Sequence, residues 1–123
     1  MAYFSQEKKK EMAPKIKEVL NYYGLKGRLS VYNHSTVVLN ISEGKPNLLE
    51  NVDTRGNKYL NINRYYLEHY TNNEILHSFL IEALTILNNG NHNRSDLQSD
   101  YHDVGWYVEI RIGAWDKPYK VLN

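Results

Sequence analysis

Apolar side chains recur at helical spacing near the start of the chain. Ser5 is a residue type that caps helix N-termini, and Gly24 is a type that ends helices in a left-handed conformation. The pattern therefore predicts a helix over residues 5–23, in which Pro14 either kinks the helix or opens its main part at the first position. The apolar residues that lie on one face of this helix are Met12, Ile16, Val19, Leu20 and Tyr23.

Strict alternation of apolar and polar residues predicts strands in the next part of the chain. Residues 29–41 are typical of a β-hairpin that turns at Asn33-His34, since Asn tolerates the left-handed backbone of a tight turn. Residues 43–57 contain Gly and Pro and are expected to form a loop. A third strand is predicted over residues 59–63 and a last one over residues 106–112.

A second helical region is predicted over residues 64–88. Thr71 followed by Glu74 fits a capping box, so the main helix is expected to begin there after a short turn over residues 65–70. Residues 91–104 are expected to form a polar loop. The apolar stripe of the helix consists of Leu76, Phe79, Leu80, Ala83, Leu84 and Leu87.

This order, α-β-β-β-α-β, predicts an α+β fold: an antiparallel sheet of three to four strands with two main helices packed on one face. Alternation within the strands indicates that only one face is covered, because strands buried on both faces are continuously apolar. The length of 123 residues fits one domain over residues 1–123. Tyr32, Tyr59 and Tyr107 are out of phase with the core and are expected on the open face.

Composition limits the classes of protein that the chain can belong to. It has no cysteine, which excludes disulfides, thiolate metal sites and cysteine nucleophiles. No signal peptide and no membrane span is predicted, so a cytoplasmic location is expected. The net charge is only +1, but basic residues dominate residues 1–30 and acidic residues dominate residues 95–116. These opposite poles either steer a partner or are two solvated patches.

No local motif for catalysis or nucleotide binding occurs, which favours a protein that is not an enzyme and has no cofactor or metal. The main candidate for a site is the loop of residues 92–103, where carboxylates and imidazoles could hold a divalent cation or act as an acid–base pair. The same residue types also satisfy the backbone of a structured loop. The candidate residues are Asp96, Asp100, Tyr101, His102 and Asp103.

His34 is a candidate in the predicted hairpin turn because Ser35 and Thr36 follow it. A Ser–His pair needs an orienting third group and an oxyanion hole, and the sequence shows neither. Hydrogen bonding within the turn is therefore favoured over catalysis.

The open sheet face is a candidate binding surface. Tyr32, Tyr59 and Tyr107, with Arg111 and other cations nearby, suit a protein partner. They also suit stacking of single-stranded nucleic-acid bases. Simple cross-strand packing is the third interpretation.

Several stretches of the chain together resemble a small-domain family of bacteriophages and conjugative elements, among the large polyvalent-protein-associated domains. No settled activity and no functional residue come with this resemblance. It implies a setting, namely a phage-encoded accessory protein that acts against host defences. The stretches are KEMAPKIKEVLNYYGLKG (residues 10–27), residues 28–41 with the turn Asn33-His34-Ser35-Thr36, residues 95–101, and residues 107–119 with Gly113, Trp115, Lys117, Pro118 and Tyr119.

The hypothesis that follows is an accessory protein of a phage or mobile genetic element that binds a host protein, such as a component of host defence. A single-strand nucleic-acid-binding protein is the first alternative. A small metal-dependent enzyme centred on residues 92–103 is the second. A homo-oligomer is also compatible with an exposed aromatic sheet face.

Overall fold

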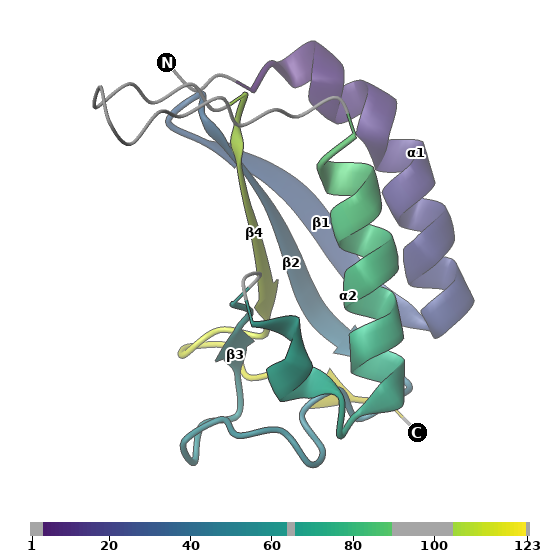
Figure 1. Ribbon diagram of the computed structural model, residues 1–123, viewed down its shortest axis with the longest axis vertical. Coiled ribbons are helices and arrows are strands. Elements are labelled where there is room, and N and C mark those ends of the chain that lie inside the picture. Colours follow the sequence, from purple (N-terminus) through teal and green to yellow (C-terminus); the bar gives the residue numbers. More distant parts are fainter. Residues whose placement is uncertain (1–3, 64–65, 90–104, 123) are drawn as a thin grey trace.

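The computed structural model describes residues 4–63, 66–89 and 105–122. Within them, two α-helices lie side by side on one face of a twisted five-stranded sheet (Figure 1). This arrangement confirms the predicted α+β class and the approximate order of helices and strands. The elements are α1 (Gln6–Tyr23), β1 (Leu25–Tyr32), β2 (Thr36–Gly44), β3 (Leu60–Asn61), the 3₁₀ turn η1 (Leu67–Tyr70), α2 (Glu74–Leu87), β4 (Tyr107–Ile112) and β5 (Lys120–Val121).

The sheet is mixed, so the prediction of a wholly antiparallel sheet was wrong. Its strand order is β1-β2-β4-β3, and β5 pairs with β2. The pairs β1/β2 and β3/β4 are antiparallel, whereas β4 and β5 each run parallel to β2. The parallel β2/β4 pair arises because α2 carries the chain back along the sheet before β4 begins, as parallel neighbours require (Figure 1).

Local residues set the ends of α1 as the sequence predicts. The Ser5 hydroxyl accepts a hydrogen bond from the backbone N–H of Lys8 at 3.1 Å. Gly24 ends the helix with a φ of 70°, and its N–H donates to carbonyls of the last turn. The helix is continuous through Pro14, so Pro14 does not open it. Pro14 lies on the exposed side, where water can bond the carbonyl left without a donor.

The main helix α2 begins differently from the prediction, because Asn73 and not Thr71 caps it. The Asn73 side chain accepts from the N–H of Leu76 at 3.1 Å. Its amide group also donates to the carbonyls of Asn47 and Glu50, at 2.9 and 3.1 Å. The Thr71 hydroxyl instead bonds the carbonyl of Glu68. Asn73 therefore joins the start of α2 to the loop that follows β2.

Replacing Asn73 by alanine is expected to lower the free energy of unfolding by about 1–2 kcal/mol, because a helix cap and two bonds to the loop are lost. Thr71→Ala should change it by less than about 0.5 kcal/mol, since its hydroxyl is exposed. Urea denaturation of both variants measures the difference. Equal effects would contradict the assignment of the cap to Asn73.

One apolar core lies between the helices and the sheet. Leu76, Phe79 and Leu80 of α2 are fully buried against β2 and β4 side chains such as Leu39 and Ile112. At one end of the sheet, Phe4 and Trp106 pack edge to face with ring centroids 5.5 Å apart. The Trp106 indole N–H donates to the carbonyl of Leu87 at 2.9 Å, so its polar atom is satisfied inside the core.

Two tyrosine hydroxyls tie outlying parts of the chain together. The Tyr23 hydroxyl on α1 donates to the Glu82 carboxylate on α2, and this bond raises the pKa of Tyr23 to about 12. Near the C-terminus, the Tyr119 hydroxyl donates to the carbonyl of Pro46 at 2.7 Å. Burial raises the pKa of Tyr119 to about 12. Both hydroxyls therefore remain protonated donors at neutral pH.

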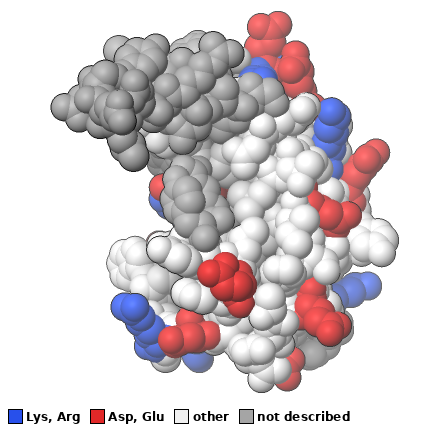
Figure 2. Space-filling model, in the orientation of Figure 1, with Lys and Arg blue, Asp and Glu red and all other residues white. Residues whose placement is uncertain are grey.

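On the side of the molecule that α2 presents, the described charged side chains form no single cluster of one sign (Figure 2). Figure 2 shows cations and carboxylates there interspersed among uncharged side chains. No helix in the described parts of the chain is both long and apolar enough to cross a membrane.

Candidate binding surface on the open sheet face

One face of the sheet packs against the two helices. On the other face, the described residues form no second layer of helices or strands (Figure 1). In β4, Val108, Ile110 and Ile112 belong to the core, so the residues that alternate with them point to the other side. The same alternation holds in β1 and in β2 as far as Ile41, and we call this side the open face. After Ile41 the register shifts, so that Glu43 is the partner of Lys26. The open-face residues on the three longest strands are Lys26, Arg28, Ser30, Tyr32, Thr36, Val38, Asn40, Ser42, Glu43, Tyr107, Glu109 and Arg111.

The hairpin turn sets the register of the open face. Asn33 and His34 have φ angles of 53° and 57°, and the N–H of Ser35 donates to the carbonyl of Tyr32 at 3.1 Å. Positive φ at both central residues is what a type I′ turn requires. The turn places Tyr32 opposite Thr36, as the predicted hairpin at Asn33-His34 implies.

Two tyrosines form a row across three strands. Thr36 is the partner of Tyr32 on one side and of Tyr107 on the other. Neighbouring strands lie about 5 Å apart, so the Cα atoms of the two tyrosines are separated by about 10 Å. Their side chains are 48% and 44% exposed. We call this row, with Glu109 and Arg111, the Tyr end of the open face.

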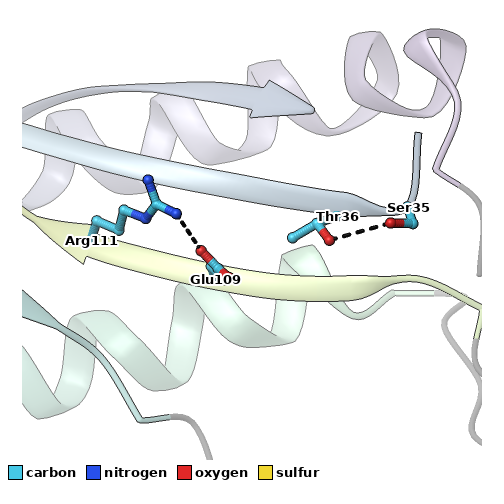
Figure 3. Close-up of polar contacts among 4 residues, drawn as sticks. All are labelled: Ser35, Thr36, Glu109 and Arg111. Carbon is cyan, nitrogen blue, oxygen red and sulfur yellow. Dashed lines mark hydrogen bonds and ion pairs between the residues drawn. The ribbon is translucent and has the colours of Figure 1, made fainter. Parts of the chain in front are cut away.

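Arg111 links β4 to the tyrosine row. Its guanidinium points toward the Glu109 carboxylate (Figure 3), with 2.8 Å between the nearest nitrogen and oxygen. The central carbon of the guanidinium lies 5.6 Å from the centre of the Tyr32 ring. Val38 lies between these residues on β2 and is fully buried, although it points away from the helices. The Tyr end is therefore a packed surface in which the cation is already paired.

Among the described residues, no hydrogen bond orients the His34 side chain as a catalytic base would require. It is exposed at the turn, and no described hydrogen bond joins its side chain to Ser35. The Ser35 hydroxyl instead lies 3.5 Å from the Thr36 hydroxyl (Figure 3). The backbone carbonyl of His34 accepts a hydrogen bond from the N–H of Phe4, which connects the turn to the start of α1.

Tyr59 does not join the row that Tyr32 and Tyr107 form. It is half-exposed and immediately precedes β3, whose first residue, Leu60, pairs with Ile112 at the end of β4. Tyr107 begins β4, so about 17 Å of strand separates the two tyrosines. The sequence places all three tyrosines on one face but contains no signal for their distance along it.

The loop candidates lie outside the described residues: Asp96, Asp100, Tyr101, His102 and Asp103. Among the residues that are described, no group of three His, Asp or Glu side chains is placed to hold a metal ion.

A second feature occupies the opposite end of the open face, where β1 begins and β4 ends. It is a groove with a cavity of about 450 Å³. Beyond it, Trp115 is 81% exposed. Sequence reasoning gave no role to Lys26, Lys117 or Trp115, because exposure cannot be inferred from residue type. The residues that line this basic groove are Lys26, Gly27, Arg28, Asn40, Ile41, Ser42, Gly113, Ala114 and Lys117.

Comparison of the chain with protein-family models, with curated proteins and with solved structures gives no match.

Proposed function

We propose that the protein is a non-enzymatic accessory protein of a bacteriophage or mobile element that binds a host protein through the Tyr end of the open face. The observation that carries this proposal is the row Tyr32–Thr36–Tyr107 with Arg111 beside it. Tyrosine and arginine are enriched among residues that dominate protein–protein binding energy. The resemblance of residues 10–41, 95–101 and 107–119 to a domain family of bacteriophages and conjugative elements supports a host-cell setting, with a component of host defence as the partner.

Electrostatics favour a protein partner at this end over a nucleic acid. The cation at the Tyr end, Arg111, is bonded to Glu109 at 2.8 Å. The pair leaves no net charge to attract a phosphate backbone, and the exposed carboxylate of Glu109 would repel one. The Tyr end therefore suits a partner protein whose surface offers apolar and hydrogen-bonding groups, because the charges of Arg111 and Glu109 cancel.

Hydrogen bonds from neighbouring segments fix the backbone at Tyr107 and at the hairpin turn after Tyr32. The N–H of Tyr107 donates to the carbonyl of Ser35 at 2.8 Å. The N–H of Phe4 binds the turn at His34, and Phe4 itself is buried against Trp106. A surface that is ordered before binding loses little conformational entropy when a partner docks.

The combined variant Tyr32→Ala/Tyr107→Ala is expected to weaken binding of the partner by at least about 30-fold, since even one residue of this kind contributes about 2 kcal/mol or more. Partners are captured with tagged protein from infected host cells, and their affinity is then measured with the purified pair. Tyr22→Ala is the matched control, because Tyr22 is 81% exposed but lies on α1. The control should bind like the native protein.

Thermal melting of both variants separates loss of binding from loss of fold. A partner that the folded double variant retains with unchanged affinity would contradict the proposal. Equal loss in the Tyr22→Ala control would contradict it as well, because the effect would not be specific to the open face.

A further inference from the structure

The basic groove carries positive charge that no described carboxylate neutralises fully. Lys26 Nζ lies 3.5 Å from Glu43 Oε1. Arg28 and Lys117 form no ion pair within the described part of the chain. Neither Glu43 nor Asp116, the acidic residues next to the groove in the chain, belongs to its lining. The groove is therefore a local positive site on a chain whose net charge is only +1.

Neutral hydrogen-bonding groups complete the lining. Asn40 lies between Arg28 on β1 and Arg111 on β4, because it is the register partner of both. The Ser42 hydroxyl is exposed and bonds the carbonyl of Lys26 at 3.2 Å. The register of β1 and β2 shifts at Lys26/Gly27, and bulges of this kind bend a strand and hollow the sheet surface. Amide, hydroxyl and guanidinium groups together are the usual set that contacts nucleic-acid phosphates.

An exposed indole belongs to the turn whose ends line the groove. Trp115 is at the tip of a tight turn closed by Ala114 N–H to the carbonyl of Lys117 at 2.8 Å and by Lys117 N–H to the carbonyl of Ala114 at 3.1 Å. Ala114 and Lys117 both line the groove, so the turn holds Trp115 beside it. Tryptophan is on average well buried in folded proteins, yet this side chain is 81% exposed. A flat, exposed ring in a turn that also carries a lysine, Lys117, can serve as a stacking platform for a nucleic-acid base.

We propose that the basic groove binds single-stranded nucleic acid. Arg28 and Lys117 contact the phosphate backbone, and Trp115 stacks on a base. A single strand is required because the base faces of a duplex are already stacked within it. The volume of about 450 Å³ lies within the ordinary range of ligand sites, and a groove of that size takes part of a strand. This site is distinct from the Tyr end and does not depend on the protein partner proposed there.

Intrinsic tryptophan fluorescence tests the stacking directly. The other tryptophan, Trp106, is 5% exposed and bonded inside the core, so a ligand reaches Trp115 first. At low salt, an oligothymidylate of about 12 nucleotides is expected to quench the emission, since single-strand sites span about 4–16 nucleotides. Anisotropy of the labelled oligonucleotide gives the affinity, which should fall as salt rises.

Substitutions assign the binding to the groove. Arg28→Ala/Lys117→Ala should weaken binding at least about tenfold and reduce the slope of log affinity against log salt by about 1.4, or about 0.7 for each phosphate contact. Trp115→Ala should weaken it at least about fivefold. Lys10→Ala/Lys15→Ala removes the same charge from α1, which contributes no residue to the groove lining, and should have little effect. Tyr32→Ala/Tyr107→Ala should also bind normally.

Four results would overturn the proposal. The first is the absence of both quenching and an anisotropy change at low salt. The second is an equal loss in the Lys10→Ala/Lys15→Ala control, which would indicate diffuse attraction. The third is competition by polyglutamate as strong as that by the oligonucleotide, which would indicate an acidic protein instead. The fourth is a duplex that binds as tightly as the single strand.

Discussion

Phe79→Ala is expected to lower the free energy of unfolding by about 3–5 kcal/mol, the largest effect of any single substitution considered for this fold. Phe79 is fully buried at the centre of α2. Its ring packs edge to face on Tyr23 of α1 with centroids 5.7 Å apart. The substitution therefore leaves a cavity where α1, α2 and the sheet meet, and it also removes an aromatic contact.

Urea denaturation measures this loss, with Ile81→Ala on the same helix as the control. Ile81 is 46% exposed, so its truncation should cost less than about 1 kcal/mol. Where Phe79→Ala does not fold, Phe79→Leu fills most of the space and should cost about 1.5 kcal/mol. Similar costs for Phe79→Ala and Ile81→Ala would contradict the position of Phe79 in the core.

Gly113→Ala is expected to destabilise the protein by about 3 kcal/mol. Gly113 ends β4 with a φ of 70°, a conformation that disfavours any side chain. A Cβ atom there would lie 2.4 Å from the backbone nitrogen of Tyr119, which cannot move without disturbing the bond of that nitrogen to the carbonyl of Lys58. The backbone strain of a side chain at positive φ and the collision with Tyr119 therefore both destabilise the Gly113→Ala variant.

Gly56→Ala is the matched control for Gly113→Ala. Gly56 has a φ of 80°, but a Cβ atom there would meet nothing within 4 Å. Its substitution should cost only the conformational strain, about 1–2 kcal/mol. Thermal melting measures the loss of stability of each variant, and the difference between the two losses is the contribution of the collision with Tyr119. An equal loss in both variants would mean that the turn after β4 moves to accept the methyl group.

Helix α2 shows where local sequence signals compete. By residue type, two helix starts are acceptable here. One is a capping box formed by Thr71 and Glu74, and the other is an N-cap at Asn73. The structure uses Asn73 because its amide also bonds the carbonyls of Asn47 and Glu50, more than twenty residues earlier in the chain. No pattern near residue 73 contains that information. The apolar stripe of the helix was predicted, whereas its first residue was not.

The two parts of the open face differ in how far the sequence predicts them. Alternation in residues 106–112 already places Tyr107, Glu109 and Arg111 on one side, and the burial of the residues between them agrees. The basic groove has no such signal. Its cations come from β1 and from the turn after β4, and Trp115 is distinguished only by its exposure in the folded chain.

The sequence by itself determined the helix α1 with its ends, the hairpin turn at Asn33-His34 and the face to which each strand residue points. These features depend on residues within a few positions of one another, through capping, backbone preference and the two-residue period of a strand. That period is the same in parallel and antiparallel pairs, so it does not encode strand direction. Only the tertiary structure decided that β4 lies between β2 and β3 and runs parallel to β2. Because α2 packs along the sheet in the direction opposite to β2, the chain comes back to the end of the sheet where β2 begins, and β4 starts there (Figure 1). The resulting β2/β4 register places Thr36 beside Tyr107 and Asn40 beside Arg111.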